Sequence, residues 1–250
     1  MPFHHVDLHH HVNLVDDLNL QHQVDFNYAN LDHQVDLNHH DQFSSLLAHV
    51  PYSAPGSHDD TSHHRIEHFL NNLKVEHPKF GNELNNIVIL DSSYDFTIIK
   101  NDDTCYLLVR GTDLSIGQST ALRDIYNDSL IGLGQSPNRV DTIEAHLIRQ
   151  MNEHPTCNWE AIGHSMGGRI VEDIGVKHPE IRVTSFQAAR TPWDREGIKN
   201  ILTNKYHDNI TSHKIIGDPI SVGPSPGTTI YHSLQECKDL ICHSLDNYNF

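Results

Sequence analysis

Basic residues and cysteines are scarce in this chain, and it has no long apolar run. Lys and Arg together number 17 against 33 Asp and Glu, which gives a net charge of −16 with neutral histidines. Binding to DNA or RNA without sequence preference depends on basic residues that release counterions, so this composition argues against a nucleic-acid partner. It also argues against docking on an anionic membrane by charge alone.

No apolar run approaches the ~18–20 residues of a transmembrane helix. The first ten residues, MPFHHVDLHH, lack the basic region and apolar stretch of a secretory signal. The four cysteines, at positions 105, 157, 237 and 242, form no CxxC pair. We therefore expect neither a disulfide framework nor a zinc site, and reduced thiols in an intracellular or particle-associated protein.

Residues 1–64 contain no Lys, Arg or Glu, but they hold 9 Asp and 13 of the 23 histidines. The mixture becomes ordinary from Arg65 onward. The stretch PYSAPGSHDDTS at 51–62 is rich in loop-forming residues. These shifts predict a His- and Asp-rich N-terminal arm over 1–64 and a separate domain over 65–250.

The arm carries a weak six-residue repeat, seen in VDLHHH, VNLVDD and LNLQHQ. Each full unit starts apolar–Asp/Asn–apolar, and in an extended chain both apolar side chains then share one face. The repeat predicts short strands that contact a protein partner or a second copy of the chain. The Asp, Asn and His content is equally typical of disorder, so both interpretations stay open.

Adjacent histidines occur in this arm at 9–11, 39–40 and 63–64. On a strand, neighbouring side chains point to opposite faces, and no carboxylate or cysteine completes a metal-binding spacing. We expect no metal site and no cofactor.

From residue 61 onward, helical and β-type patterns alternate. The expected order is helix 61–74, strands 86–90, 95–100 and 105–110, helix 138–154, strand 157–163, helix 167–179, strand 181–189, helix 194–206 and strand 210–217. This order favours an α/β fold in which helices flank a mostly parallel sheet.

The stretch WEAIGHSMGGRI places a single serine, Ser165, between a predicted strand and a predicted helix. This is the setting of a nucleophile elbow, a tight turn that exposes the serine oxygen at the sheet edge. Gly163 and Gly167 would let neighbouring backbone pass, and the amide of Met166 would point to a developing oxyanion. The alternative is a glycine-rich turn with a capping serine.

A serine nucleophile needs a base, and the base needs a carboxylate that orients it. Asp218 follows the strand pattern HKIIG and precedes Pro219, so it would lie where a loop leaves the sheet. The alternative is an Asp-Pro pair that only starts the loop. The candidate bases after Asp218 are His232 and His243.

Five motifs resemble those of the class 3 lipases, a family of the α/β-hydrolase fold. They are CYLLVRGTD, GHSMGG, VTSFQAARTP, IIGDPISVGP and CHSLDNY. The resemblance implies Ser165 as nucleophile, Asp218 as orienting acid and His243 as base. It also implies an oxyanion hole from Thr112 and Met166, and it makes His232 a second, noncatalytic histidine rather than the base.

The predicted function is hydrolysis of carboxylic esters through an acyl-enzyme intermediate. Lipid esters as substrates are implied by the resemblance alone. The alternative is a structural or assembly protein, for example a virion component, built on a lipase-like domain and anchored by its arm.

Overall fold

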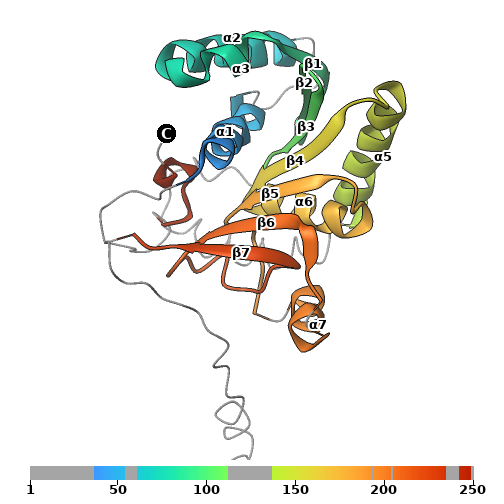
Figure 1. The fold of residues 1–250 in the computed structure, drawn as a ribbon, viewed down its shortest axis with the longest axis vertical. Helices are drawn as coiled ribbons and strands as arrows, with labels where there is room; N and C mark the ends of the chain where they lie inside the picture. The colour runs from blue at the N-terminus through green and yellow to red at the C-terminus, as the bar shows by residue number, and fades with distance from the viewer. Residues whose placement is uncertain are drawn as a thin grey trace, which may run out of the picture. The chain divides into compact units, whose positions relative to one another are not determined.

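Seven strands of the described chain form one mixed sheet, in which they lie side by side in sequence order (Figure 1). They are β1 (Ile87–Ser92), β2 (Phe96–Asn101), β3 (Thr104–Val109), β4 (Asn158–His164), β5 (Arg182–Phe186), β6 (His207–Ile215) and β7 (Gly227–His232). A computed structural model gives these elements and describes residues 37–53, 61–111, 137–192, 194–203, 205–234 and 242–248. β1 to β3 pair antiparallel, and β3 to β7 pair parallel.

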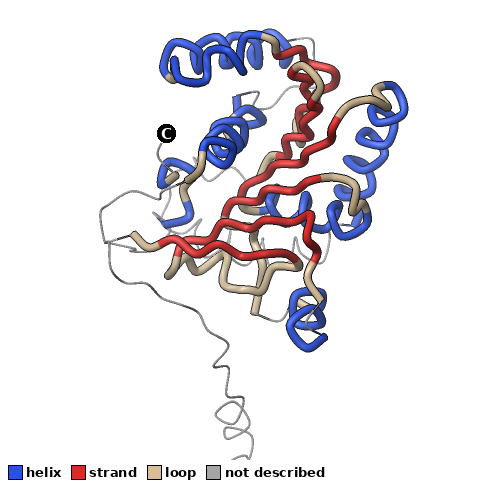
Figure 2. Tube along the Cα trace, in the orientation of Figure 1, coloured by secondary structure: helices blue, strands red, loops and turns tan. Residues whose placement is uncertain are grey.

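Helices alternate with the parallel strands along the chain and lie on both sides of the sheet (Figure 2). α5 (Pro137–Glu153) comes between β3 and β4, α6 (Met166–Lys177) between β4 and β5, and α7 (Arg195–Thr203) between β5 and β6. The predicted α/β fold with a mostly parallel sheet is confirmed. Because parallel strands end at the same edge, residues that follow β4 and β6 come together there.

Alternating side chains of β3 divide the core into two apolar clusters, one on each face of the sheet. Cys105, Leu107 and Val109 pack with residues of α5 and α6, including Leu147 and Ile170. Tyr106 and Leu108 point to the other face, as the two-residue period of a strand requires. That second face is covered by α1 (His39–Ala48), α2 (Thr61–Glu76) and α3 (Gly81–Asn85), with two short 3₁₀ helices, η2 (Val50–Ser53) and η3 (Pro78–Phe80).

The predicted arm boundary near residue 64 is wrong for residues 37–53. Instead of a strand or a disordered segment, this stretch forms α1 and η2 and lies in the same compact unit as the sheet. Its apolar residues, Phe43, Leu46, Leu47 and Val50, have the spacing of a helix, and all four are buried in the core. The Asn38 side chain caps α1 by accepting the backbone N–H of Asp41. The last unit of the six-residue repeat, VDLNHH at 35–40, overlaps this segment: Leu37 is buried, Asn38 is the cap, and the two histidines begin α1. The earlier units lie outside the described residues.

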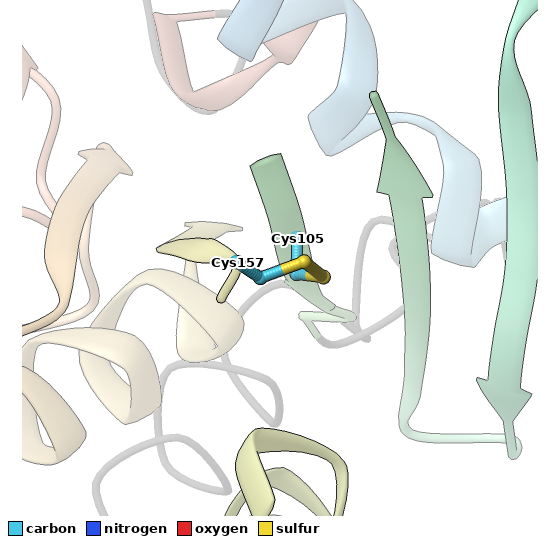
Figure 3. Close-up of a disulfide and its surroundings, with 2 residues drawn as sticks. All are labelled: Cys105 and Cys157. Atoms are coloured by element: carbon cyan, nitrogen blue, oxygen red, sulfur yellow. A yellow bond between two sulfur atoms is a disulfide. The ribbon is translucent and has the colours of Figure 1, made fainter. Parts of the chain in front are cut away.

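The expectation of reduced thiols is also wrong, because Cys105 and Cys157 form a disulfide (Figure 3). Cys105 is on β3 and Cys157 immediately precedes β4, so the pairing of these two parallel strands brings the cysteines to a Cα–Cα distance of 5.7 Å. Cys242 is disulfide-bonded as well. Closing the loop of 52 residues between Cys105 and Cys157 lowers the entropy of the unfolded chain and stabilises the fold by roughly 4 kcal/mol. Because disulfides persist in oxidising compartments, the basis for expecting an intracellular protein is lost.

Helices in the described ranges are all too short or too polar to cross a membrane.

Candidate active site

Ser165 occupies a strained turn between β4 and α6. Its backbone has φ 55° and ψ −122°, a region that costs a non-glycine residue about 1–3 kcal/mol. Two hydrogen bonds, one with β5 and one with a residue just after it, hold the turn. The Ser165 N–H donates to the Phe186 carbonyl over 3.0 Å, and the Ser165 carbonyl accepts the N–H of Ala189 over 2.9 Å.

Gly163 and Gly167 leave no room for a side chain at this turn. A Cβ atom on Gly163 would lie 2.4 Å from the backbone of Gly167, and one on Gly167 would lie 2.2 Å from the carbonyl oxygen of Val109. The first turn of α6 therefore packs directly on the backbone of β3. This close approach is the reason for the glycines on both sides of Ser165, as the sequence predicts.

A continuous chain of hydrogen bonds joins Asp218, His243 and Ser165. The His243 Nε2 atom lies 2.8 Å from the Ser165 Oγ atom, and its Nδ1 atom lies 2.8 Å from Asp218 Oδ2. Ser165 and Asp218 follow β4 and β6 at the shared carboxyl edge of the sheet, and His243 lies in the C-terminal segment 242–248. The structure thus brings together the three residues that the sequence predicts as a triad.

The carboxylate of Asp218 is buried but well supplied with hydrogen-bond donors. Its Oδ1 atom accepts the Ile220 N–H over 3.0 Å, and its Oδ2 atom accepts the Ser221 hydroxyl over 2.6 Å as well as His243. Burial acts to raise the pKa of Asp218, but the bonds from His243 and Ser221 outweigh it and hold this pKa below its usual value. Because an ionised carboxylate only accepts, His243 donates from Nδ1 and leaves Nε2 to accept the Ser165 hydroxyl proton.

The other predicted site residues lie as follows. Met166 is the first residue of α6, directly after Ser165, at the end of the helix where backbone N–H groups favour negative charge. Thr112 lies outside the described residues, which end at Gly111 on this side of the gap. His232 ends β7, and its ring stacks on the ring of His213. The His232 Nε2 atom lies 3.0 Å from the His213 Nδ1 atom. The described contacts of His232 include neither Ser165 nor Asp218.

Two residues near the base were not predicted. His164, the last residue of β4, lies with its Nε2 atom 2.7 Å from the backbone carbonyl oxygen of His243. The Tyr52 hydroxyl lies 3.3 Å from His164 Nδ1 and accepts the Gly111 N–H over 2.9 Å. His164 stands inside the GHSMGG motif, but nothing in the sequence shows where its ring points. Tyr52 lies within the predicted arm, 1–64, for which the sequence indicates no contact with the site.

A buried ion network supports the loops beside the triad. The Arg190 guanidinium is fully buried and pairs with Glu172, with Asp173 over 3.0 Å and with Asp194 over 2.8 Å. The Arg190 carbonyl also accepts the N–H of Gly223, in the loop that begins near Asp218. Replacing one partner would leave a buried charge unpaired, so we expect such a change to destabilise the fold strongly.

Within the described ranges, no group of three or more His, Cys, Asp or Glu side chains is placed to hold a metal ion. A surface hollow of about 860 Å³ lies at the opposite end of β6, beside Tyr206 and His207. The residues that line it include no member of the triad.

Burial of His232 makes the stability of the fold depend on pH. Burial, followed by the neighbouring His213, lowers the pKa of His232 from its ordinary 6.5 to about 4. The unfolded chain therefore binds a proton that the folded chain does not, between these two values. Stability from this group is complete above pH ~6.5 and declines as the pH falls towards ~4.

We expect His232→Gln to reduce this acid sensitivity, because glutamine keeps a polar group beside His213 but does not titrate. Between pH 7 and pH 5 the variant should lose roughly 2 kcal/mol less free energy of unfolding than the parent chain. Urea unfolding at both pH values measures the difference. The control is His64→Gln, whose histidine side chain is 91% exposed. Equal losses for the parent chain and His232→Gln would contradict the prediction.

Neither a protein-family model nor a curated protein sequence matches this chain. Solved structures similar to it include fungal lipases. Lipase II from Rhizopus niveus is 16% identical over 72% of this chain and 72% of that chain, with a TM-score of 0.42. A lipase from Rhizopus microsporus var. chinensis is 14% identical over 82% of this chain and 78% of its own, with a TM-score of 0.41. A mutant form of MDLA from Penicillium cyclopium is 15% identical over 81% and 83%, with a TM-score of 0.47.

The first two of these proteins are named as lipases. At these identities and TM-scores, however, the likeness does not establish an activity. A functional assignment therefore depends on the residues and distances of this chain.

Proposed function

We propose that this protein is a serine hydrolase that cleaves carboxylic esters through an acyl-enzyme intermediate. The observation that carries the proposal is the Asp218–His243–Ser165 hydrogen-bond chain, with 2.8 Å at each of its two links, at a strained turn between a strand and a helix. Nucleophile, base and orienting acid in this geometry are the parts that acyl transfer requires. A capping serine would not need this base beside it.

In the proposed reaction the Ser165 oxygen attacks the ester carbonyl while His243 Nε2 takes the hydroxyl proton. The alcohol leaves with that proton, and the acyl group stays on Ser165. A water molecule then gives its proton to His243 and attacks the acyl-enzyme, which releases the acid and restores Ser165. The negative oxygen in both steps would be stabilised by the Met166 N–H at the start of α6 and by Thr112.

Lipid esters are the proposed substrate class, on the basis of the five motifs that resemble class 3 lipases. The chemistry of the triad itself requires only an activated carbonyl. The preferred acyl length and leaving group are therefore to be measured with a series of esters.

The deciding experiment combines an active-site probe with an ester series. We expect a fluorophosphonate probe to label the folded chain at Ser165, as found by mass spectrometry of its peptides. The same preparation should hydrolyse p-nitrophenyl esters, and a series of rising chain length gives the preferred acyl group. His232→Gln should keep this activity, because His232 is not the base. Folded protein that neither labels nor hydrolyses any ester of the series would overturn the proposal.

A further inference from the structure

The proposed base lies on a short C-terminal segment, so its position depends on what holds that segment. His243 belongs to the described stretch 242–248, which includes the 3₁₀ helix η5 (Leu245–Asn247). Three contacts fix the stretch to the sheet. Gln187 donates to the Cys242 carbonyl, His164 contacts the His243 carbonyl over 2.7 Å, and the Tyr248 hydroxyl donates to the His213 carbonyl over 3.2 Å.

The contact from His164 acts on the backbone of the base itself. A carbonyl oxygen can only accept, so the His164 Nε2 atom must carry the proton in this bond. Burial, followed by the neighbouring His243, keeps the pKa of His164 well below its ordinary value, so its ring is neutral. A neutral ring with a proton on Nε2 has a bare Nδ1, which can only accept.

Tyr52 completes the arrangement. Its hydroxyl oxygen accepts the N–H of Gly111 over 2.9 Å, and the hydroxyl donates to His164 Nδ1, 3.3 Å away. That contact fixes the His164 tautomer whose Nε2 proton the His243 carbonyl needs. At its other end, the same hydroxyl holds Gly111, the residue before the proposed oxyanion donor Thr112.

The backbone at Gly111 is packed too closely to leave room for a side chain. A Cβ atom on Gly111 would lie 2.5 Å from the Tyr52 hydroxyl and 2.6 Å from the carbonyl oxygen of His164. The end of β3, the end of β4 and the Tyr52 side chain are therefore packed against one another directly beneath Ser165. A shift of the hydroxyl would be transmitted to both strand ends.

We propose that Tyr52 and His164 are positioning residues of this hydrolase, forming a hydrogen-bond chain from Gly111 to the backbone of His243. The inference rests on the proposed function and deepens it. Neither residue touches the reacting atoms. Their role is to hold the base and the oxyanion side of the site in a fixed relative position. Segment 37–53, which contains Tyr52, is then part of the framework of the active site.

The test compares ester hydrolysis by full-length variants that remove single links. Tyr52→Phe removes one hydroxyl, and we expect kcat to fall about 10-fold with KM nearly unchanged. His164→Leu removes the donor to His243, and kcat should fall roughly 100-fold, the cost of a displacement of about 1 Å. His164→Gln offers an amide N–H near the position of Nε2 and should restore most of the loss seen in His164→Leu. The control is Tyr206→Phe, a surface tyrosine beside β6.

Circular dichroism and the thermal unfolding midpoint show whether each variant is folded at the assay temperature. Should His164→Leu not fold, Tyr52→Phe and His164→Gln carry the test. A residue that only supports the fold would change the midpoint and leave kcat of the folded protein unchanged. Parental kcat in folded Tyr52→Phe, with an active parent chain, would overturn this inference alone. A parent chain without labelling or hydrolysis would overturn the proposed function and the inference with it.

Discussion

Ser165→Ala is expected to lower kcat for ester hydrolysis by about 10⁴–10⁶ while the fold is kept. Alanine lacks the oxygen that would form the acyl-enzyme, so His243 has no nucleophile to activate. Nucleophile and base act as a unit, which is why one replacement removes nearly all of the triad's contribution. The backbone strain does not increase, because alanine and serine meet the same difficulty at φ 55°.

The measurement is kcat on the best p-nitrophenyl ester of the series, together with fluorophosphonate labelling. Ser233→Ala serves as the matched control, since Ser233 is an exposed serine just beyond β7. It should label and hydrolyse like the parent chain. If Ser165→Ala kept more than a hundredth of the parental kcat, the nucleophile would be another group and the proposed function would be wrong.

Local signals made the elbow predictable from the sequence. The end of β4, Gly163, Ser165, Gly167 and the start of α6 fall within a few residues of one another, and short-range sterics explain why each residue type is there. Asp218 was predictable for a related reason. It follows a strand of the parallel sheet, and the edge at which parallel strands end is the place where loop residues meet.

The composition of the N-terminal residues is the reason that the sequence analysis does not predict the helix α1. Phe43, Leu46, Leu47 and Val50 have helical spacing, but they follow a segment rich in Asp, Asn and His whose repeat has the two-residue period of a strand. The composition therefore predicts one arm for the whole stretch before residue 65. Burial of these four side chains in the core stabilises this segment, and a local sequence pattern does not show that packing.

Contacts between distant residues were beyond the sequence analysis. Cys105 and Cys157 are 52 residues apart, and only the register of β3 and β4 makes them neighbours. Tyr52 and His164 are separated by 112 residues. These two residues can meet only when α1 and η2 pack on the sheet. The wrong prediction of an arm therefore also left the contacts that support His243 unpredicted.

Asp218→Asn should lower kcat by roughly 10⁴, a loss that a change of tautomer produces in a Ser-His-Asp triad. Asparagine has the shape of aspartate, and the Ile220 N–H, which bonds Asp218 Oδ1, would hold the amide oxygen at that position. The amide nitrogen then takes the place of Oδ2 and faces His243 Nδ1. As a donor, it requires a bare Nδ1, so the proton of His243 moves to Nε2 and the ring can no longer accept the Ser165 proton.

This loss should lie in kcat and leave KM nearly unchanged, because Asp218 is buried behind His243 and the substitution conserves volume. It should also be smaller than the loss for Ser165→Ala, since the nucleophile and base remain in place. Steady-state kinetics of both variants on one ester gives the comparison, and Asp208→Asn, an exposed aspartate on β6, is the matched control. A kcat within tenfold of the parent chain for Asp218→Asn would show that the 2.8 Å contact between Asp218 and His243 does not set the tautomer of the base, and another acid would have to be sought.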